Sequence, residues 1–153
     1  MTRLRRAQLA APRLAWYWLP VLLWMALILG LSGRSDFPSR TNPATGEVVT
    51  TTYTLAKTAH VVEYSVLGSL LLRAATAPGG GLGLAPTRAA IWVVVAATAF
   101  GIGDELRQSF VPKREPRLAD VAIDAMSALA AVVLMVVWRR LRDTQRYAQR
   151  IVE

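Results

Sequence analysis

The chain is 153 residues long, a length typical of one domain. Apolar residues make up 54% of the sequence and the mean hydropathy is positive, which is unusual for a soluble domain. The absence of cysteine excludes a disulfide framework and thiolate chemistry. The net charge is +8, but most of the basic residues lie in two tails and one loop, and the tails, with Tyr147 as their single aromatic residue, lack interleaved aromatic stacking platforms. No nucleic-acid partner is therefore predicted.

The first predicted element is a transmembrane helix over residues 14–32. Its apolar run of 18 residues is long enough to span a bilayer, and no small-x-small cleavage site follows it, which argues against a signal peptide. Trp16, Tyr17 and Trp18 stand at its start, where amphipathic rings settle among lipid headgroups. The preceding residues, 1–13, form a basic tail.

A second helix is predicted over residues 57–75. The threonine-rich stretch before it, 32–56, contains turn-forming glycine and proline residues, and it is predicted to be a surface loop with a short extended piece at 48–53. The second half of the helix is apolar, whereas its first half is polar. Steps of three and four place the polar side chains on one helical face. They are Lys57, His60, Glu63 and Tyr64.

A glycine-rich connector over residues 76–87 separates this helix from a third, predicted over 88–109. The connector lacks the Lys-Ser/Thr of a phosphate-binding loop and no strand precedes it, so a flexible link is the better interpretation. The uncharged run of the third helix, 89–103, is short for a span. Its polar end, from Asp104 to Gln108, must therefore continue the helix into the membrane interface.

The fourth helix is predicted over residues 118–140, with Asp120, Asp124 and Ser127 on one face. Trp138 and the two arginines after it close the span. The basic tail that follows has the charge pattern of a helical extension lying in water or at the membrane surface.

Four spans place both termini on the same side of the membrane. Eleven of the 18 basic residues lie on that side, in the tails and around the glycine-rich connector, and seven lie on the other, so the termini are predicted to be cytoplasmic. The predicted fold is an all-α integral membrane bundle of four transmembrane helices. It comprises a basic cytoplasmic N-tail at 1–13, a membrane domain at 14–140 and a basic cytoplasmic C-tail at 141–153.

Alternating helix directions bring the polar ends of the last three helices to one membrane face, predicted to be the outer one. Several carboxylates in so apolar a place need nearby cations, and His60 beside Glu63 or Asp104 would hold a proton suited to acid–base work. His60, Glu63 and Asp104 are therefore the catalytic candidates. The predicted ligand-binding residues are Lys57, His60, Glu63, Tyr64, Asp104, Glu105, Gln108, Arg114, Asp120 and Asp124.

A structural interpretation competes with this one, because polar residues at helix ends often tie helices together without a substrate. It is the better interpretation for Gln108 and Glu115, while Arg107, Lys113 and Arg117 are predicted to be solvated or headgroup-facing cations. The polar residues include donors for a carboxylate-rich metal site, but their spacing is not specific. No metal and no other cofactor is predicted.

In combination, the motifs of these elements resemble those of the VanZ-like family over roughly residues 20–140. They are Lys57-x-x-His60 with Glu63-Tyr64 and Leu67, Asp104-Glu105-x-x-Gln108-x-Phe110-Val111-Pro112-x-Arg114, and Asp120-Val121 with a polar residue four positions on. The resemblance implies a small multi-pass bacterial membrane protein of the cell envelope, in the cytoplasmic membrane. The family takes its name from a member associated with teicoplanin resistance. Asp124 replaces the family's usual Asn and Ser127 its usual Gly.

The leading hypothesis is that the polar site binds an anionic or peptide-bearing envelope component, or a glycopeptide drug that mimics or covers it. In that hypothesis Lys57 and Arg114 contact the anion. The alternatives are a membrane hydrolase or transferase acting on a lipid-linked substrate through His60, a proton-coupled transporter, and a scaffold. Membrane lipids are expected partners in every case.

Overall fold

A computed structural model describes residues 3–32, 44–45, 50–79, 81–111 and 117–152. These residues form four helices, which confirms the all-α class: α1 (Arg3–Ser32), α2 (Thr50–Thr76), α3 (Pro86–Gln108) and α4 (Leu118–Val152). Within the described ranges, three segments are long and apolar enough to cross a membrane, namely Arg13–Ser32, Pro86–Gln108 and Leu118–Tyr147. α2 is not among them, because polar residues occupy its first half.

Two helix starts differ from the sequence-based expectation. α1 begins at Arg3 rather than at residue 14, and α2 begins at Thr50 rather than at residue 57. Residues 50–53 are therefore helical, and the extended piece predicted there is wrong; residues 48–49 lie outside the described part. Threonine favours strands only weakly, and its hydroxyl can bond the carbonyl one turn back, as Thr58 Oγ1 does to Thr54 O at 2.8 Å.

The other boundaries agree closely. The connector after α2 is non-helical over the described residues 77–79 and 81–85, and α3 ends one residue from its predicted end. α4 continues without a break to Val152, so the expected helical extension is confirmed.

The core of the bundle lies between α2, α3 and α4. α2 packs most extensively on α4, α3 packs next most extensively on α4, and α1 lies mainly against α2. On α3 the buried positions recur about every four residues, from Ala89 and Val93 to Gly101 and Gln108. Many buried residues are alanines, and small side chains let helix backbones approach closely, which is how membrane helices pack.

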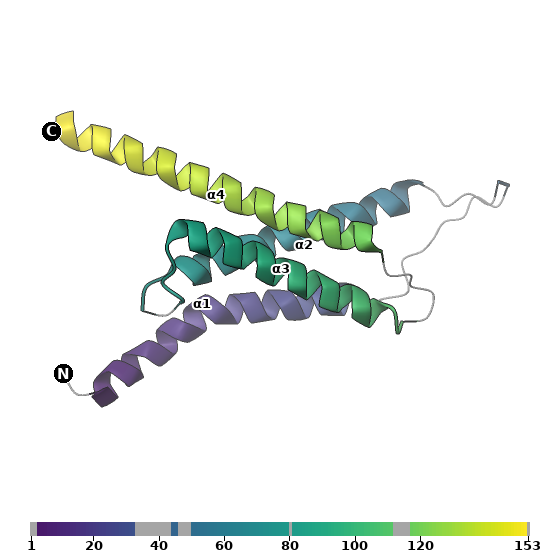
Figure 1. Cartoon of the computed structure of the whole chain (residues 1–153), viewed down its shortest axis with the longest axis horizontal. Coiled ribbons are helices and arrows are strands. Elements are labelled where there is room, and N and C mark those ends of the chain that lie inside the picture. Colours follow the sequence, from purple (N-terminus) through teal and green to yellow (C-terminus); the bar gives the residue numbers. More distant parts are fainter. Residues whose placement is uncertain (1–2, 33–43, 46–49, 80, 112–116, 153) are drawn as a thin grey trace.

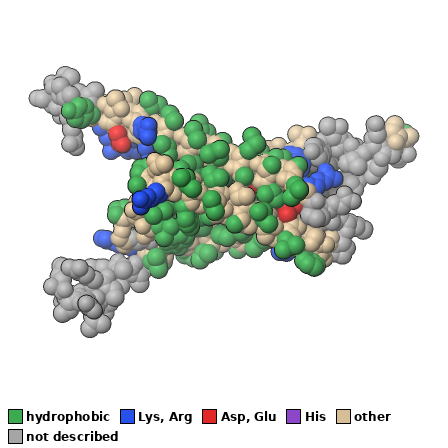
Figure 2. Space-filling model, in the orientation of Figure 1, with side chains coloured by type: hydrophobic (Ala, Val, Ile, Leu, Met, Phe, Trp, Pro, Cys, Tyr) green, Lys and Arg blue, Asp and Glu red, His purple; other side chains and the backbone are tan. Residues whose placement is uncertain are grey.

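Large apolar side chains, in contrast, point outward. Leu22 and Leu23 on α1, Ile91 on α3 and Leu134 on α4 are each at least 60% exposed. Figure 2 shows that hydrophobic side chains cover the middle of the visible face, with Lys and Arg toward its two ends. An apolar surface around a bundle with a partly polar interior suits lipid rather than water.

Helix directions alternate, so that both termini lie at one end of the bundle (Figure 1). The end of α1, the start of α2, the end of α3 and the start of α4 lie at the opposite end. This is the end at which the polar residues of the sequence meet.

Candidate functional site

The polar end of the bundle combines the first half of α2 and the first turns of α4 with the last turns of α3. The term polar cluster is used here for its described members: Lys57, His60, Glu63, Tyr64, Asp104, Glu105, Gln108, Asp120 and Asp124. All the members on α3 and α4 are buried, as is Tyr64 on α2. Asp120, Asp124 and Ser127 are all buried, as their spacing on one helical face predicts. Arg114, the remaining predicted member, lies outside the described residues.

His60 of α2 pairs with Asp124 of α4. Nδ1 of His60 lies 2.9 Å from Oδ1 of Asp124, whose side chain is 1% exposed. The sequence placed His60 beside Glu63 or Asp104, and Glu63 does line the same opening as His60. The carboxylate that is bonded to His60 is instead Asp124, because α2 packs most closely on α4, which presents Asp124 one turn after Asp120. A carboxylate that accepts from one ring nitrogen sets the tautomer, so the other nitrogen can take a proton or contact a ligand.

Gly101 of α3 leaves the space in which this pair lies. A Cβ at Gly101 would be 3.0 Å from Oδ2 of Asp124 and 3.3 Å from the hydroxyl of Tyr64. Tyr64 is fully buried between His60 and Phe100, with ring centroids at 6.5 and 6.2 Å. Its hydroxyl lies beside the carboxylate of Asp124, although among the described residues no well-formed hydrogen bond reaches it.

A second tie between α2 and α4 joins the Lys57 ammonium group to Oδ1 of Asp120. The two side chains are 18% and 13% exposed. Close by, the backbone N–H of Arg117 donates to Oε2 of Glu105 at 2.7 Å, which links α3 to the start of α4. Lys57 is thus already engaged by a carboxylate of the cluster.

Asp104 gathers donors from two helices. Its Oδ1 accepts from Ser32 Oγ at 2.8 Å and from Arg107 Nη2 at 2.9 Å, and its Oδ2 accepts from Gln108 Nε2 at 3.0 Å. Arg107 also donates to Ser32 Oγ at 2.6 Å. Arg107 is therefore not simply a solvated cation, as the sequence suggested, because a buried carboxylate one helical turn away attracts it. Asp104 ties α1 to α3 and does not face His60 as a partner.

A small opening between α1, α2 and α3 lies beside these pairs. Its volume is about 40 Å³, and its lining residues are Leu31, Ser32, Ala56, Ala59, His60, Glu63 and Gln108. No hydrogen-bond or ion-pair partner among the described residues reaches the carboxylate of Glu63, although its backbone oxygen accepts from Trp24 Nε1 at 2.8 Å. The opening therefore presents an imidazole, a carboxylate, an amide and a hydroxyl to a small polar group.

Three members of the cluster lie close enough together to hold a metal ion. One ring nitrogen of His60 and one carboxylate oxygen each of Glu105 and Asp120 lie within 4.8 Å of one another. Mixed nitrogen and oxygen donors suit a divalent ion such as zinc or manganese. Because the Lys57 ammonium group already contacts Asp120, an ion would bind there in competition with the lysine.

Sequence reasoning missed two residues that build the site, Ser32 and Gly101. Ser32 was interpreted only as the end of a helix, but its hydroxyl contacts both Asp104 and Arg107. Gly101 had a usable signal, because a glycine inside an apolar helix commonly marks a close approach of another element.

Comparison with known protein families gives a match. The profile of the VanZ/LLP1 family matches residues 16–139, which is most of the chain and contains every member of the polar cluster. No curated protein and no solved structure matches significantly. The resemblance seen in the sequence motifs is thereby confirmed.

Proposed function

The chain belongs to the VanZ/LLP1 family, and from this premise we propose that it is a multi-pass membrane protein whose polar cluster binds the peptide-bearing part of a lipid-linked envelope component. In this proposal all four helices cross the bacterial cytoplasmic membrane, the termini are cytoplasmic and the cluster lies near the outer headgroups. A glycopeptide drug of the teicoplanin type covers the same envelope component, and this shared target links the protein to resistance in the proposal.

A crossing by α2 is compatible with its polar first half. Lys57 pairs with Asp120 and His60 with Asp124, so two of its polar side chains are satisfied by α4 instead of facing lipid. Polar residues within membrane spans are tolerated when they face the bundle interior and find partners there.

The opening lined by Glu63, His60, Gln108 and Ser32 is the observation that supports a peptide-bearing ligand. An amide group offers one donor and one acceptor, and the carboxylate of Glu63 and the second ring nitrogen of His60 offer complements for both. The described cations supply little for a purely anionic ligand, since Lys57 and Arg107 each contact a carboxylate. Binding of an anion would rest on Arg114.

The test uses purified protein and measures the shift in thermal unfolding with three probes: a soluble muramyl pentapeptide, undecaprenyl phosphate and teicoplanin. A probe that binds only the folded state raises its melting temperature, and at 100 times its dissociation constant the gain is about 2.7 kcal/mol. We expect the pentapeptide to stabilise the wild type and to lose most of this effect in Glu63→Gln, which keeps the shape of the side chain and removes its charge.

Asp143→Asn is the matched control, because Asp143 is an exposed carboxylate on the extension of α4, far along the helix from the cluster. It should leave the shift unchanged. If the pentapeptide stabilises wild type and Glu63→Gln equally, or stabilises neither, binding at this opening is wrong.

An enzyme is the second candidate, favoured by the His60–Asp124 contact of 2.9 Å. A histidine oriented by a carboxylate is the arrangement that general bases commonly use. Turnover of a lipid-linked peptide substrate by the purified protein, abolished in His60→Gln, would establish hydrolysis or transfer in place of simple binding.

A further inference from the structure

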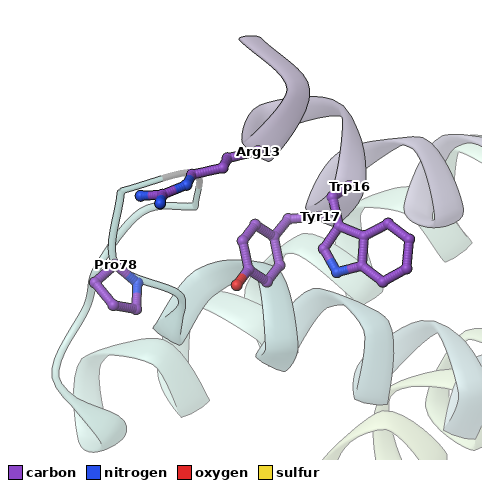
Figure 3. A pocket seen from close by; sticks show the side chains of 4 residues that line it. All are labelled: Arg13, Trp16, Tyr17 and Pro78. Carbon is purple, nitrogen blue, oxygen red and sulfur yellow. The ribbon is translucent and has the colours of Figure 1, made fainter. Parts of the chain in front are cut away.

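The opposite end of the bundle holds a separate pocket. It is open, its volume is about 500 Å³, and it is lined by Arg13, Trp16 and Tyr17 of α1 and by Pro78 of the connector that follows α2. Figure 3 shows the three α1 side chains and the proline around it. None of these residues belongs to the polar cluster.

A second arginine lies over the rings of this pocket. The guanidinium carbon of Arg73, in the last turn of α2, is 5.4 Å from the ring centroid of Trp16 and 5.1 Å from that of Tyr17. Its Nη2 also lies 3.4 Å from the backbone oxygen of Trp16. Stacking on two rings fixes the position of the guanidinium group while leaving other N–H donors free.

The connector approaches Arg13 closely. A Cβ at Gly79 would lie 3.6 Å from Nη1 of Arg13. The backbone of Gly79 has a φ of +73°, a value that residues other than glycine rarely adopt. The turn at Pro78 and Gly79 thus forms one wall of the pocket beside the Arg13 guanidinium.

The positive charge of this pocket is not balanced locally. In the described part of the chain, no carboxylate forms an ion pair with Arg13 or Arg73. The sequence has no acidic residue before Asp36 and none between Glu63 and Asp104, so α1, the end of α2 and the connector carry none. At the polar cluster, by comparison, each described cation has a carboxylate nearby.

The pocket also lies where headgroups would be. The segment of α1 that is apolar enough to span a membrane begins at Arg13, and Trp16 and Tyr17 occupy its first turn. Tryptophan and tyrosine concentrate at that level of a bilayer. A planar guanidinium group can donate two parallel hydrogen bonds to two oxygens of one phosphate.

We propose that this pocket binds the phosphate of an anionic phospholipid headgroup, held by Arg13 and Arg73 against the rings of Trp16 and Tyr17. The bound phosphate belongs to a lipid rather than to a free anion in solution, because the rings and the apolar start of α1 contact the glycerol and the first acyl carbons of the lipid. The site is independent of the polar cluster and of the function proposed for it.

The test measures lipid retention by native mass spectrometry of the full-length protein, released from micelles containing equal amounts of phosphatidylglycerol and phosphatidylcholine. The wild type should retain phosphatidylglycerol preferentially. Arg13→Gln with Arg73→Gln should weaken this retention about tenfold or more, because the change removes the guanidinium donors that hydrogen-bond the phosphate.

Arg142→Gln is the matched control. Arg142 also lies over a tryptophan, with its guanidinium carbon 5.2 Å from the Trp138 ring, but it lines no part of this pocket. It removes one positive charge, as each single change of the double variant does, and a ring contact of the type that Arg73 makes, and it should leave retention unchanged. Equal losses in Arg142→Gln and the double variant would reduce the effect to net charge and overturn the proposal.

Two further arms complete the design. Arg13 is exposed, so Arg13→Gln alone keeps the fold and should still weaken retention measurably; unchanged retention in this variant overturns the proposed role of Arg13. Inorganic phosphate added at millimolar concentration should not displace phosphatidylglycerol. Complete displacement would assign the site to a soluble anion and overturn the lipid as its ligand.

Discussion

The partner of His60 shows what residue spacing does and does not determine. Steps along α2 predict that His60 shares a face with Lys57 and Glu63, and the structure agrees that all three lie at the polar end. Spacing within one helix cannot select a partner on another helix, however, and the packing of α2 on α4 places Asp124 there at 2.9 Å.

We predict that His60 and Asp124 are energetically coupled. His60→Gln and Asp124→Asn should each lower the free energy of unfolding by about 1–3 kcal/mol, the usual range for a hydrogen bond that involves a charged or buried group. The double variant should cost less than the two single changes together, because both remove the same contact. Thermal unfolding of the four proteins measures this coupling.

The matching cycle pairs His60→Gln with Asp104→Asn. Asp104 contacts Ser32, Arg107 and Gln108, so its effect should add to that of His60 within about 0.5 kcal/mol. Strong coupling in this cycle and additivity with Asp124 would mean that the sequence-based pairing was correct and the observed one is not.

At the scale of helices, the contact between α2 and α4 depends on one glycine. A Cβ at Gly68 would lie 3.0 Å from both the Cα and the backbone oxygen of Ala128. Ser127, which stands where the family usually has glycine, turns its hydroxyl back to Ile123 O at 2.7 Å and does not separate the helices. Gly68 on α2 therefore permits the close approach of α2 and α4, even though Ser127 replaces a glycine on α4.

Gly68→Ala should separate α2 from α4 and destabilise the protein by about 1–3 kcal/mol, as overpacking of a tight contact does. Because the Lys57–Asp120 and His60–Asp124 contacts of the polar cluster both join these helices, ligand binding there should weaken as well. The comparison is Gly103→Ala on α3, where nothing lies within 4 Å of the added carbon and no loss is expected. Equal melting temperatures for Gly68→Ala and the wild type would show that the helices can part without cost.

At the scale of the whole molecule, charge is distributed toward two ends separated by an apolar surface (Figure 2). The end with the termini carries the arginines of α1, the end of α2 and α4. The other carries the carboxylates of the polar cluster together with Lys57 and Arg107. This asymmetry is the physical basis for the predicted orientation.

The absence of cysteine makes the orientation directly testable. Single changes Thr54→Cys near the start of α2, Thr87→Cys at the start of α3 and Ser109→Cys just after α3 are all at exposed positions. On intact cells, a membrane-impermeant maleimide should label positions 54 and 109 and leave position 87 unlabelled. Labelling of 87 alone would reverse the orientation, and identical behaviour of 54 and 87 would show that α2 does not cross.

Much of the fold follows from the sequence because it depends on local quantities. The apolar runs, their lengths and the prolines and glycines between them predict four helices, and the need to satisfy backbone hydrogen bonds in lipid leaves no other regular element for such runs. Boundaries in polar stretches, such as the start of α2 at Thr50, were less predictable because helix propensity there is weak and no apolar periodicity marks where the helix begins.

The sequence by itself determined that this protein is helical and apolar, that it resembles the VanZ-like family, and that its polar residues meet at one end, since helix period and alternating direction need no tertiary information. Only the tertiary structure decided the pairings within that end: His60 with Asp124, Lys57 with Asp120, and Asp104 with Ser32, Arg107 and Gln108. Those pairings depend on the rotation and separation of neighbouring helices. Small residues such as Gly68 and Gly101 set both through close steric contact.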